Sequence, residues 1–228
     1  NNLNEIKRFI QNKKITHLVN FAGLSRIKCE ENKIDCLNTN FKSIKKIINF
    51  LNKFSDKPHF IFISTSHVYN FSRTKLKEKS KTNPKNIYSK LKLRSENYIK
   101  RYYKNYTILR LFNIYGPNQS KNYFVQDMRE KIKKGSVIKI DKSIRDFIHV
   151  SEVSRVIKFI IKKKINGTIN VGSGKDYSLI KIVKYLSKKL KKKPILIVKN
   201  EKTKLVADIS LLKSYGFKTT INEKYINF

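Results

Sequence analysis

The sequence predicts an α/β protein built on a doubly wound parallel sheet, and two observations predict it. Short apolar runs alternate with longer amphipathic segments along most of the chain, which is the pattern of strand–helix units. One run, residues 59–64, is apolar at almost every position, as expected for a strand buried on both faces of a parallel sheet. Ligands of such sheets bind at the carboxyl ends of the strands, so the residues that follow the strands are the first candidates for a site.

The elements can be placed in order from the apolar periodicity. The expected strands are residues 15–21, 59–64, 106–111 and 168–171. The expected helices are residues 30–53, 86–104, 151–163 and 178–190. In the first of these helices one face carries Ile44, Ile47, Ile48 and Leu51, which is the spacing of a helix packed on a core.

The composition favours a globular protein and argues against a nucleic-acid partner. A chain of 228 residues with 39% hydrophobic residues can bury a sizeable core, as one domain or two small ones. The net charge is +36, but only nine of the 52 basic residues are arginines and the lysines are spread over every segment. A codon bias toward Lys, Asn and Ile explains this more simply than nucleic-acid binding. The positive field still attracts anionic ligands such as nucleotide diphosphates.

The cysteines and the apolar runs indicate the compartment. Cys29 and Cys36 are too few for a disulfide framework and lack metal-ligand spacing, so a reducing compartment and a cytoplasmic location are expected. No metal site is expected. No apolar run approaches the length of a membrane span, and the N-terminus has no signal-peptide core. We therefore expect no membrane association.

A tyrosine and a lysine four residues apart, Tyr88 and Lys92, are the main chemical signal. On a helix they lie on one face, and a lysine ammonium beside a tyrosine hydroxyl favours its deprotonated form. Thr65, at the end of the strand at residues 59–64, can hydrogen-bond the same substrate oxygen. These groups can move a proton while a hydride leaves or reaches carbon. The alternative is a solvated helix face, because Tyr-x-x-x-Lys also arises by chance in a chain rich in both residues.

Ordered motifs around this pair resemble the extended short-chain dehydrogenase/reductase family, which contains nucleotide-sugar epimerases, dehydratases and reductases. They run over nearly the whole chain, as residues 20–24, Asn40, 64–69, Tyr88 with Lys92, 109–117, 145–150, 170–174 and 207–218. The resemblance implies a Rossmann-like sheet with a small C-terminal substrate-binding subdomain. Residues 1–116 and 148–171 are then the remainder of the dinucleotide-binding domain, and residues 117–147 and 172–228 are the substrate-binding part.

One element of the family is missing. The family begins with a strand, a Gly-x-x-Gly-x-x-Gly turn and a helix that holds the pyrophosphate, and an acidic or basic residue after the second strand selects NAD or NADP. Neither is found in these 228 residues. The chain is therefore expected to be a fragment that begins near the family's second helix. The choice between NAD and NADP stays open, and a catalytically inactive fragment is an alternative.

The resemblance assigns roles to particular residues. Thr65, Tyr88 and Lys92 match the catalytic positions. The cofactor-binding positions are Phe21, Ala22, Gly23, Asn40, Ser64, Tyr88, Lys92 and Phe112. The substrate-binding positions are Thr65, Asn113, Arg145 and Asp208. The implied substrate is a nucleotide-diphosphate sugar, and the implied assembly is a homodimer.

The residues around these positions restrict the class of reaction that is expected. Family dehydratases carry Asp and Glu after the threonine, where this chain has Ser66 and His67, so an epimerase or a 4-keto reductase is favoured over a dehydratase. Arg145 is expected to clamp the diphosphate, with an ion pair to Asp146 as the alternative. Leu205 stands where many epimerases have an arginine that touches the nucleotide, so the nucleotide stays open. A non-catalytic family member that binds a nucleotide or a partner is the second hypothesis, and a basic nucleic-acid-binding protein the third.

Overall fold

The structure is a computed structural model that describes residues 3–220. It divides into two compact units, which are described one at a time. Among the described residues, the first unit comprises 3–68, 84–110 and 160–169. The second unit comprises 69–83, 111–159 and 170–220.

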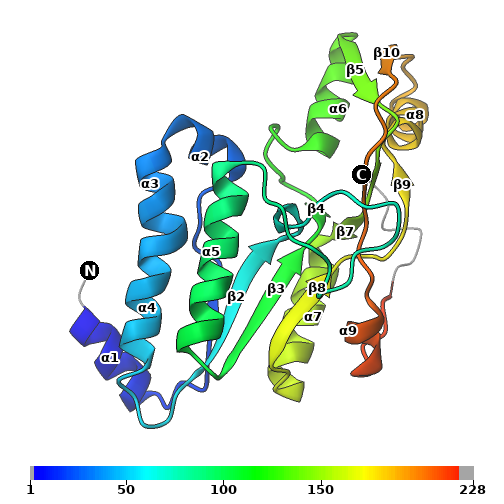
Figure 1. Ribbon diagram of the computed structural model, residues 1–228. Helices are drawn as coiled ribbons and strands as arrows, with labels where there is room; N and C mark the ends of the chain where they lie inside the picture. The colour runs from blue at the N-terminus through cyan, green and yellow to red at the C-terminus, as the bar shows by residue number, and fades with distance from the viewer. Residues whose placement is uncertain (1–2, 221–228) are drawn as a thin grey trace. The chain divides into compact units, whose positions relative to one another are not determined.

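The first unit is built on a sheet of four strands in the order β1-β2-β3-β8 (Figure 1). Its strands are β1 (His17–Asn20), β2 (His59–Thr65), β3 (Tyr106–Leu111) and β8 (Gly167–Val171), of which β3 and β8 end in the second unit. Its helices are α1 (Leu3–Asn12), α2 (Arg26–Glu31), α3 (Lys33–Leu37), α4 (Ser43–Leu51) and α5 (Ile87–Tyr102), with a π-helical turn at Asn38–Lys42 and a 3₁₀ turn at Ser66–Val68. Strand β1 pairs in parallel with β2, with His17 opposite His59.

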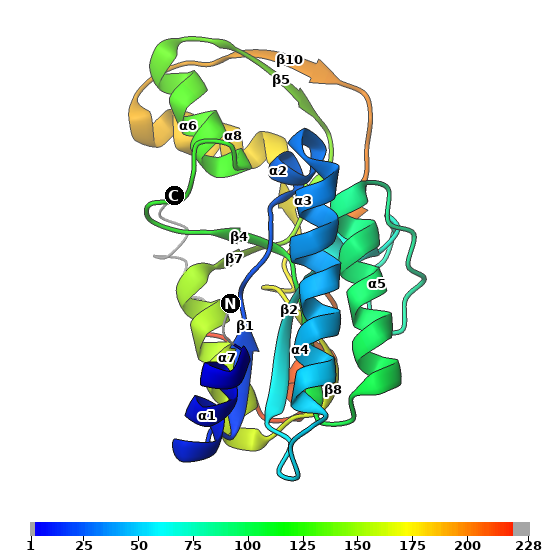
Figure 2. The ribbon, with the colours of Figure 1, turned by 90° about the vertical axis from the view of Figure 1, so that its left-hand side faces the viewer.

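The core of this unit lies between the sheet and the helices α4 and α5, which run side by side in both views (Figures 1 and 2). Ile44 and Ile48 of α4 pack with Phe60 and Phe62 of β2, and all four side chains have no exposed surface. Because β2 is buried along nearly its whole length, its continuous apolar sequence is the expected one. This packing fixes the carboxyl end of β2 against α5.

The expected helix at residues 30–53 is wrong as a single element. Asn32 has extended backbone angles (φ −137°, ψ 99°), which end α2, and its Oδ1 accepts from the amide of Asp35 to cap α3. A polar residue that competes for backbone hydrogen bonds favours such a cap over a helix interior. The helix after it widens into the π turn before α4 begins at Ser43.

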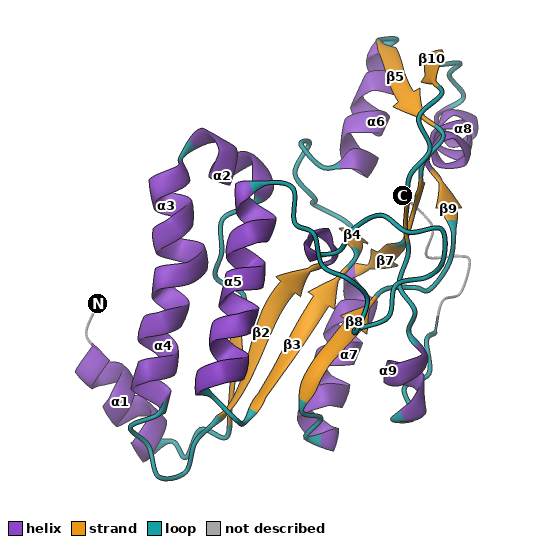
Figure 3. Ribbon diagram, in the orientation of Figure 1, coloured by secondary structure: helices purple, strands orange, loops and turns teal. Residues whose placement is uncertain are grey.

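The second unit contains short strands and the helices that cover them. Its strands are β4 (Asn113–Tyr115), β5 (Val137–Asp141), β6 (Ile144–Arg145), β7 (Phe147–His149), β9 (Tyr177–Ser178), β10 (Ile195–Lys199) and β11 (Lys204–Leu205). Its helices are α6 (Phe124–Lys134), α8 (Leu179–Leu190), α9 (Ser210–Ser214) and most of α7 (Val150–Lys163). Helices α6 and α8 pack beside the parallel pair β5–β10 (Figure 3). Strand β4 pairs in parallel with β7, and β6 lies between β11 and β9.

The predicted fold class, an α/β protein with a parallel sheet, is confirmed. The assignment of residues 1–116 and 148–171 to cofactor binding, and of 117–147 and 172–228 to substrate binding, stays a prediction. Within residues 3–220, no helix combines the length and apolar character needed to cross a membrane.

Candidate active site

Helix α5 presents Tyr88 and Lys92 one turn apart, near its N-terminus. Asn86 caps the helix, because its side chain accepts from the amide of Ser89 and the Ser89 hydroxyl lies 3.4 Å from the Asn86 amide. This reciprocal cap sets where the helix begins, and so puts Tyr88 in its first turn. The tyrosine is half-buried and packs with Leu91 beside the two cysteines.

Lys92 is almost fully buried, with 5% of its surface exposed. Its Nζ donates to the carbonyl of Ile63 at 2.8 Å and lies 4.8 Å from the centre of the Phe62 ring. Burial lowers the pKa of Lys92 to about 8, and the carboxylate of Glu96 opposes this shift. The ammonium is therefore still the main form at neutral pH, and it lies at the end of β2.

This pKa shift predicts a pH-dependent stability. The unfolded lysine has a pKa near 10.5, so between about pH 8 and pH 10.5 the unfolded chain binds more protons than the folded one and stability rises with pH. We expect Lys92→Met to abolish that rise, which amounts to about 3 kcal/mol at most. Urea unfolding at pH 7.5 and pH 10 measures it. The control is Lys90→Met, at an exposed position on the same helix. If the free energy of unfolding of Lys92→Met still rose with pH as in the wild type, the lowered pKa of Lys92 would be contradicted.

The end of β2 supplies two hydroxyl groups with different surroundings. Thr65 Oγ1 accepts from the amide of His67 at 3.2 Å, which orients the hydroxyl and leaves its proton to donate. Ser64 donates its proton to Glu96 Oε1 at 2.5 Å, and Glu96 in turn binds Arg110. The predicted catalytic role of Thr65 and the predicted cofactor contact of Ser64 stay predictions. The Ser64 hydroxyl already has an acceptor inside the protein.

The loop after β1 contains the predicted cofactor residues Phe21, Ala22 and Gly23. Phe21 is 66% exposed, and the amide of Ala22 donates to Asn20 Oδ1. A side chain at Gly23 would meet Asn40 Oδ1 and Lys92 Nζ, each at 3.2 Å. The structure therefore brings Gly23, Asn40 and Lys92 together, and a Cβ at Gly23 would push Asn40 or Lys92 away by a few tenths of an ångström.

Asn40 holds this loop in place. Its Oδ1 accepts from the amide of Leu24 at 2.7 Å, and its Nδ2 donates to the carbonyl of Leu24 at 3.0 Å. The same Nδ2 lies 3.3 Å from the sulfur of Cys29 and 3.5 Å from that of Cys36. The two cysteines form one disulfide with each other, which the expectation of a reducing compartment did not anticipate. Sequence spacing did not reveal the pair, because the break at Asn32 folds α2 and α3 toward each other.

In the second unit, Arg145 is held by neutral groups. Its guanidinium donates to the carbonyls of Ile144 and Thr203 and to Thr203 Oγ1, and lies 5.1 Å from the centre of the Phe71 ring. The alternative of an ion pair with Asp146 is wrong. Burial lowers the pKa of Arg145, and Asp141 opposes this. The predicted contact with a diphosphate stays a prediction.

Asp146 instead has a structural role. Its buried carboxylate accepts from the amides of Ser173, Gly174 and Ala207 and from the Ser173 hydroxyl. Burial raises the pKa of Asp146, and these hydrogen bonds oppose the shift. The carbonyl of Asp146 accepts from the side chain of Asn113 at 2.8 Å, which fixes that predicted substrate residue at the start of β4.

The remaining predicted residues are engaged locally. Phe112 has 2% of its surface exposed, and its ring lies 6.3 Å from that of Tyr69. Asp208 accepts from the amide and hydroxyl of Ser210, and the hydroxyl contact lowers the pKa of Asp208. The cofactor role of Phe112 and the substrate role of Asp208 stay predictions.

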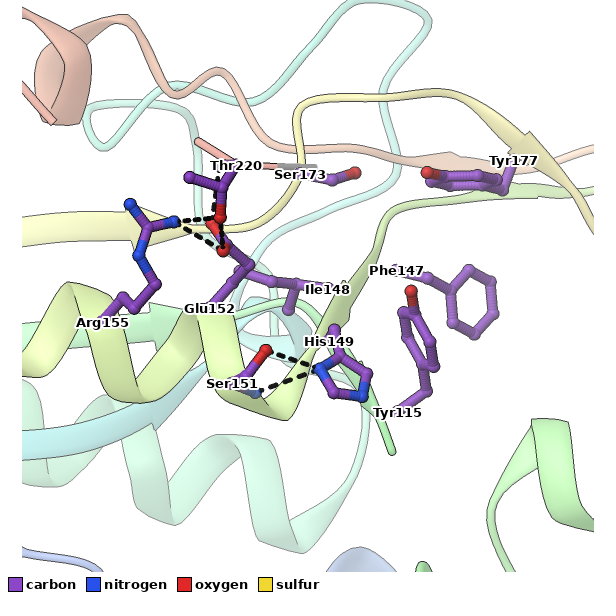
Figure 4. A pocket seen from close by; sticks show the side chains of 10 residues that line it. All are labelled: Tyr115, Phe147, Ile148, His149, Ser151, Glu152, Arg155, Ser173, Tyr177 and Thr220. Atoms are coloured by element: carbon purple, nitrogen blue, oxygen red, sulfur yellow. Dashed lines mark hydrogen bonds and ion pairs between the residues drawn. The ribbon is translucent and has the colours of Figure 1, made fainter. Parts of the chain in front are cut away.

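The second unit also has a pocket of about 350 Å³ that the sequence did not reveal (Figure 4). Aromatic side chains, Tyr115, Phe147 and Tyr177, line one part of it. Glu152 and Arg155 form an ion pair at 2.6 Å in another part. These residues come from β4, β7, β9 and α7, and no local spacing pattern joins them. Within residues 3–220, no group of three or more His, Cys, Asp or Glu side chains comes together as a metal site.

Comparison with known proteins defines the family. The model of the NAD dependent epimerase/dehydratase family matches residues 1–172, and the chain belongs to this family. A GDP-6-deoxy-D-talose 4-dehydrogenase from Aggregatibacter actinomycetemcomitans is 35% identical over 130 residues, which cover 54% of this chain and 44% of the relative. The chain spans about half the length of the curated relatives it matches.

Solved structures share the fold. The UDP-N-acetylglucosamine 4-epimerase of Methanobrevibacter ruminantium M1 is 26% identical, with a TM-score of 0.80 over 91% of this chain and 72% of that one. The UDP-glucuronic acid 4-epimerase of Bacillus cereus, solved with UDP-glucuronic acid and NAD, is 22% identical, with a TM-score of 0.83 over 97% of this chain and 74% of that one. The resemblance predicted from the motifs is therefore confirmed at the level of the family.

Proposed function

We propose that the full-length protein is an NAD(P)-dependent epimerase or 4-keto reductase of a nucleotide-activated sugar. The observation that carries the proposal is that Tyr88 lies one turn before Lys92 on α5, and that the ammonium of Lys92 is buried at the end of β2 yet mostly charged at neutral pH. A buried cation one turn from a tyrosine lowers the cost of forming the tyrosinate. Membership of the family and the similarity to epimerases and a 4-dehydrogenase support the same class.

In this mechanism Tyr88 moves the proton. Its hydroxyl takes the proton of a sugar hydroxyl when a ketone forms and returns it when the ketone is reduced. The Lys92 ammonium stabilises the tyrosinate. Thr65 donates its hydroxyl proton to the same sugar oxygen and stabilises the charge that develops there. Its orientation by the amide of His67 suits this donation.

The loop after β1 fits the cofactor that this chemistry requires. The Nδ2 atom of Asn20 is buried and has no hydrogen-bond partner within residues 3–220, and Gly23 leaves the loop backbone close to Lys92. We propose that residues 21–23, Asn40 and Lys92 hold NAD or NADP, which would supply or accept the hydride. The epimerase of Bacillus cereus was solved with NAD, which favours NAD.

The substrate part of the proposal concerns the second unit. Arg145 is a half-buried cation whose hydrogen bonds within residues 3–220 all go to neutral oxygens, while the charge of Asp141 acts on it without a hydrogen bond. A diphosphate would supply anionic oxygens that accept hydrogen bonds from this guanidinium. We propose that Arg145, with Asn113, binds the diphosphate of the sugar nucleotide.

A screen of nucleotide sugars tests the reaction. The full-length protein is incubated with UDP-, GDP- and dTDP-sugars and with their 4-keto forms, in the presence of NAD(H) or NADP(H). Interconversion of two sugars without net change in NAD(P)H identifies an epimerase, and stoichiometric consumption of NAD(P)H identifies a reductase. Formation of a 4-keto-6-deoxy sugar would contradict the preference for an epimerase or reductase over a dehydratase, which rests on Ser66 and His67. Nucleotide binding without any turnover would favour the non-catalytic alternative.

A further inference from the structure

The disulfide lies directly against the residue that positions the loop after β1. Cys29 in α2 and Cys36 in α3 have no exposed surface. Both sulfurs contact Nδ2 of Asn40, at 3.3 and 3.5 Å.

Asn40 connects the disulfide to the loop. Both polar atoms of its side chain are bonded to the backbone of Leu24, and its own carbonyl accepts from the Ser95 hydroxyl at 2.6 Å. Its Oδ1 also lies where it would meet a side chain at Gly23. A small movement of Asn40 therefore changes the loop at residues 20–24 directly.

Two features make the position of Asn40 depend on the bond between the sulfurs. Helices α2 and α3 have six and five residues, and helices this short are not stable without tertiary restraint. The cross-link is one such restraint, since it limits the conformations of the segment it closes. Cys36 also lies one turn before Asn40, just ahead of the π turn at Asn38–Lys42, so release of α3 is transmitted to Asn40.

Reduction also changes the hydrogen bonding at the carbonyl of Leu24. The sulfur of Cys29 lies 3.8 Å from the carbonyl of Leu24, the same oxygen that accepts from Asn40. A cysteine in the disulfide has no S–H, whereas a thiol can donate weakly to this carbonyl. The reduced form therefore gains a second, weak donor at this carbonyl and loses the cross-link between α2 and α3.

We propose that Cys29 and Cys36 form a reversible thiol–disulfide modification site whose oxidised form orders the loop at residues 20–24. The modification site does not depend on the proposed function. Only the expected effect of reduction on cofactor affinity rests on that function. The co-reactant is a low-molecular-weight disulfide of the glutathione class.

The chemistry balances as two successive exchanges. The thiolate of one cysteine attacks the small disulfide, forms a mixed disulfide and releases one small thiolate. The thiolate of the second cysteine attacks the mixed disulfide, forms the Cys29–Cys36 bond and releases the second. The cysteines lose two electrons and two protons, and the small disulfide gains them to become two thiols. Since both sulfurs are buried, each exchange requires local opening of the α2–α3 segment.

The first test measures the modification. The full-length protein is equilibrated with glutathione mixtures from fully reduced to fully oxidised, then denatured and treated with N-ethylmaleimide. The mass should show two added groups at these cysteines in the reduced form and none in the oxidised form. Two added groups in every mixture would overturn the proposal.

The second test measures the loop by hydrogen exchange and requires neither cofactor nor turnover. We expect the amide of Leu24 to exchange about tenfold faster in the reduced protein, while the amides of β3 stay unchanged. Cys29→Ser with Cys36→Ser should exchange like the reduced protein in every mixture. If that variant does not fold, the exchange rates of Leu24 in the oxidised and reduced wild type still test whether the disulfide orders the loop. Equal exchange at Leu24 in the two wild-type forms would overturn the link to the loop.

A third measurement concerns the cofactor. The dissociation constant of NAD should rise about fivefold on reduction of the wild type. Equal affinity in the two forms, with altered loop exchange, would overturn the effect on the cofactor and leave the modification site in place. A failure of the nucleotide-sugar screen changes neither the maleimide result nor the exchange result, so the two ideas fail separately.

Discussion

Replacing Tyr88 by phenylalanine should lower the turnover number of the full-length protein by about 100- to 10,000-fold. The substitution removes one oxygen and keeps the ring that packs beside Leu91 in the first turn of α5. Proton transfer at the sugar oxygen then has no acceptor, while the groups proposed to hold the cofactor, Gly23, Asn40 and Lys92, are untouched. The measurement is kcat with the substrate found in the screen, together with the dissociation constant of NAD, which should change by less than about twofold.

A matched control is available on the same helix. Tyr102, the last residue of α5, is 47% exposed, so Tyr102→Phe removes a tyrosine hydroxyl from the surface of the same element. It should leave kcat unchanged. A wild-type kcat in Tyr88→Phe would contradict the proposed mechanism. Equal losses of kcat in the two variants would indicate damage to the helix instead.

The parts of the fold that the sequence predicted are those in which local pattern and tertiary burial agree. Strand β2 was expected at residues 59–64 and is found at His59–Thr65, because its centre, Phe60 to Phe62, is apolar and fully buried. Helix α5 begins one residue after the expected start, where Asn86 and Ser89 cap it. At such positions a single local property, apolar character in β2 and the capping residues in α5, is enough to predict the element from the sequence alone.

The parts that were missed depend on contacts between distant segments. Asn32 ends α2 through a backbone conformation that apolar periodicity does not report. The guanidinium of Arg145 is held by Thr203, which is remote in sequence, and not by its neighbour Asp146. Asp146 is turned into the core by the amides of the turn at Ser173.

In the candidate site, too, the sequence predicted the local feature and missed the contacts between distant segments. The i, i+4 spacing was enough to place Tyr88 and Lys92 on one face of a helix. It was not enough to show that Lys92 is buried, or that its ammonium is bound to the carbonyl of Ile63. That bond comes from the packing of α5 on β2, and the burial that this packing imposes lowers the pKa of Lys92 to about 8.

The second large effect concerns the buried ion pair behind the site. Arg110 binds Glu96 through two nitrogens, with the shortest contact at 2.6 Å, and the two side chains are 3% and 0% exposed. Ser64 donates to the same carboxylate. Removing one partner of such a pair leaves an uncompensated buried charge, which costs about 3–5 kcal/mol.

We therefore expect Glu96→Leu to lower the free energy of unfolding by about 3–5 kcal/mol, measured by urea denaturation at pH 7. Arg110→Met should cost a similar amount, and the double variant should be more stable than Glu96→Leu alone, because it no longer buries an unpaired guanidinium. The control is Glu30→Leu. The Glu30 carboxylate forms a surface ion pair with Arg26 at 3.8 Å, and its removal should change the free energy of unfolding by less than about 1 kcal/mol. Additive losses in the double variant would show that the two side chains are not coupled.

The ion pair also affects the chemistry, because Glu96 lies one turn after Lys92 and its charge raises the pKa of that lysine. Arg110→Met leaves this carboxylate in place, whereas Glu96→Leu removes it. Of the two destabilised variants, only Glu96→Leu should therefore carry less charge on Lys92 at neutral pH and lose turnover beyond the loss caused by unfolding. The measurement is kcat of both variants per folded molecule, at a temperature where each is mainly folded. Equal kcat values would contradict an electrostatic role of Glu96 and leave it a purely structural one.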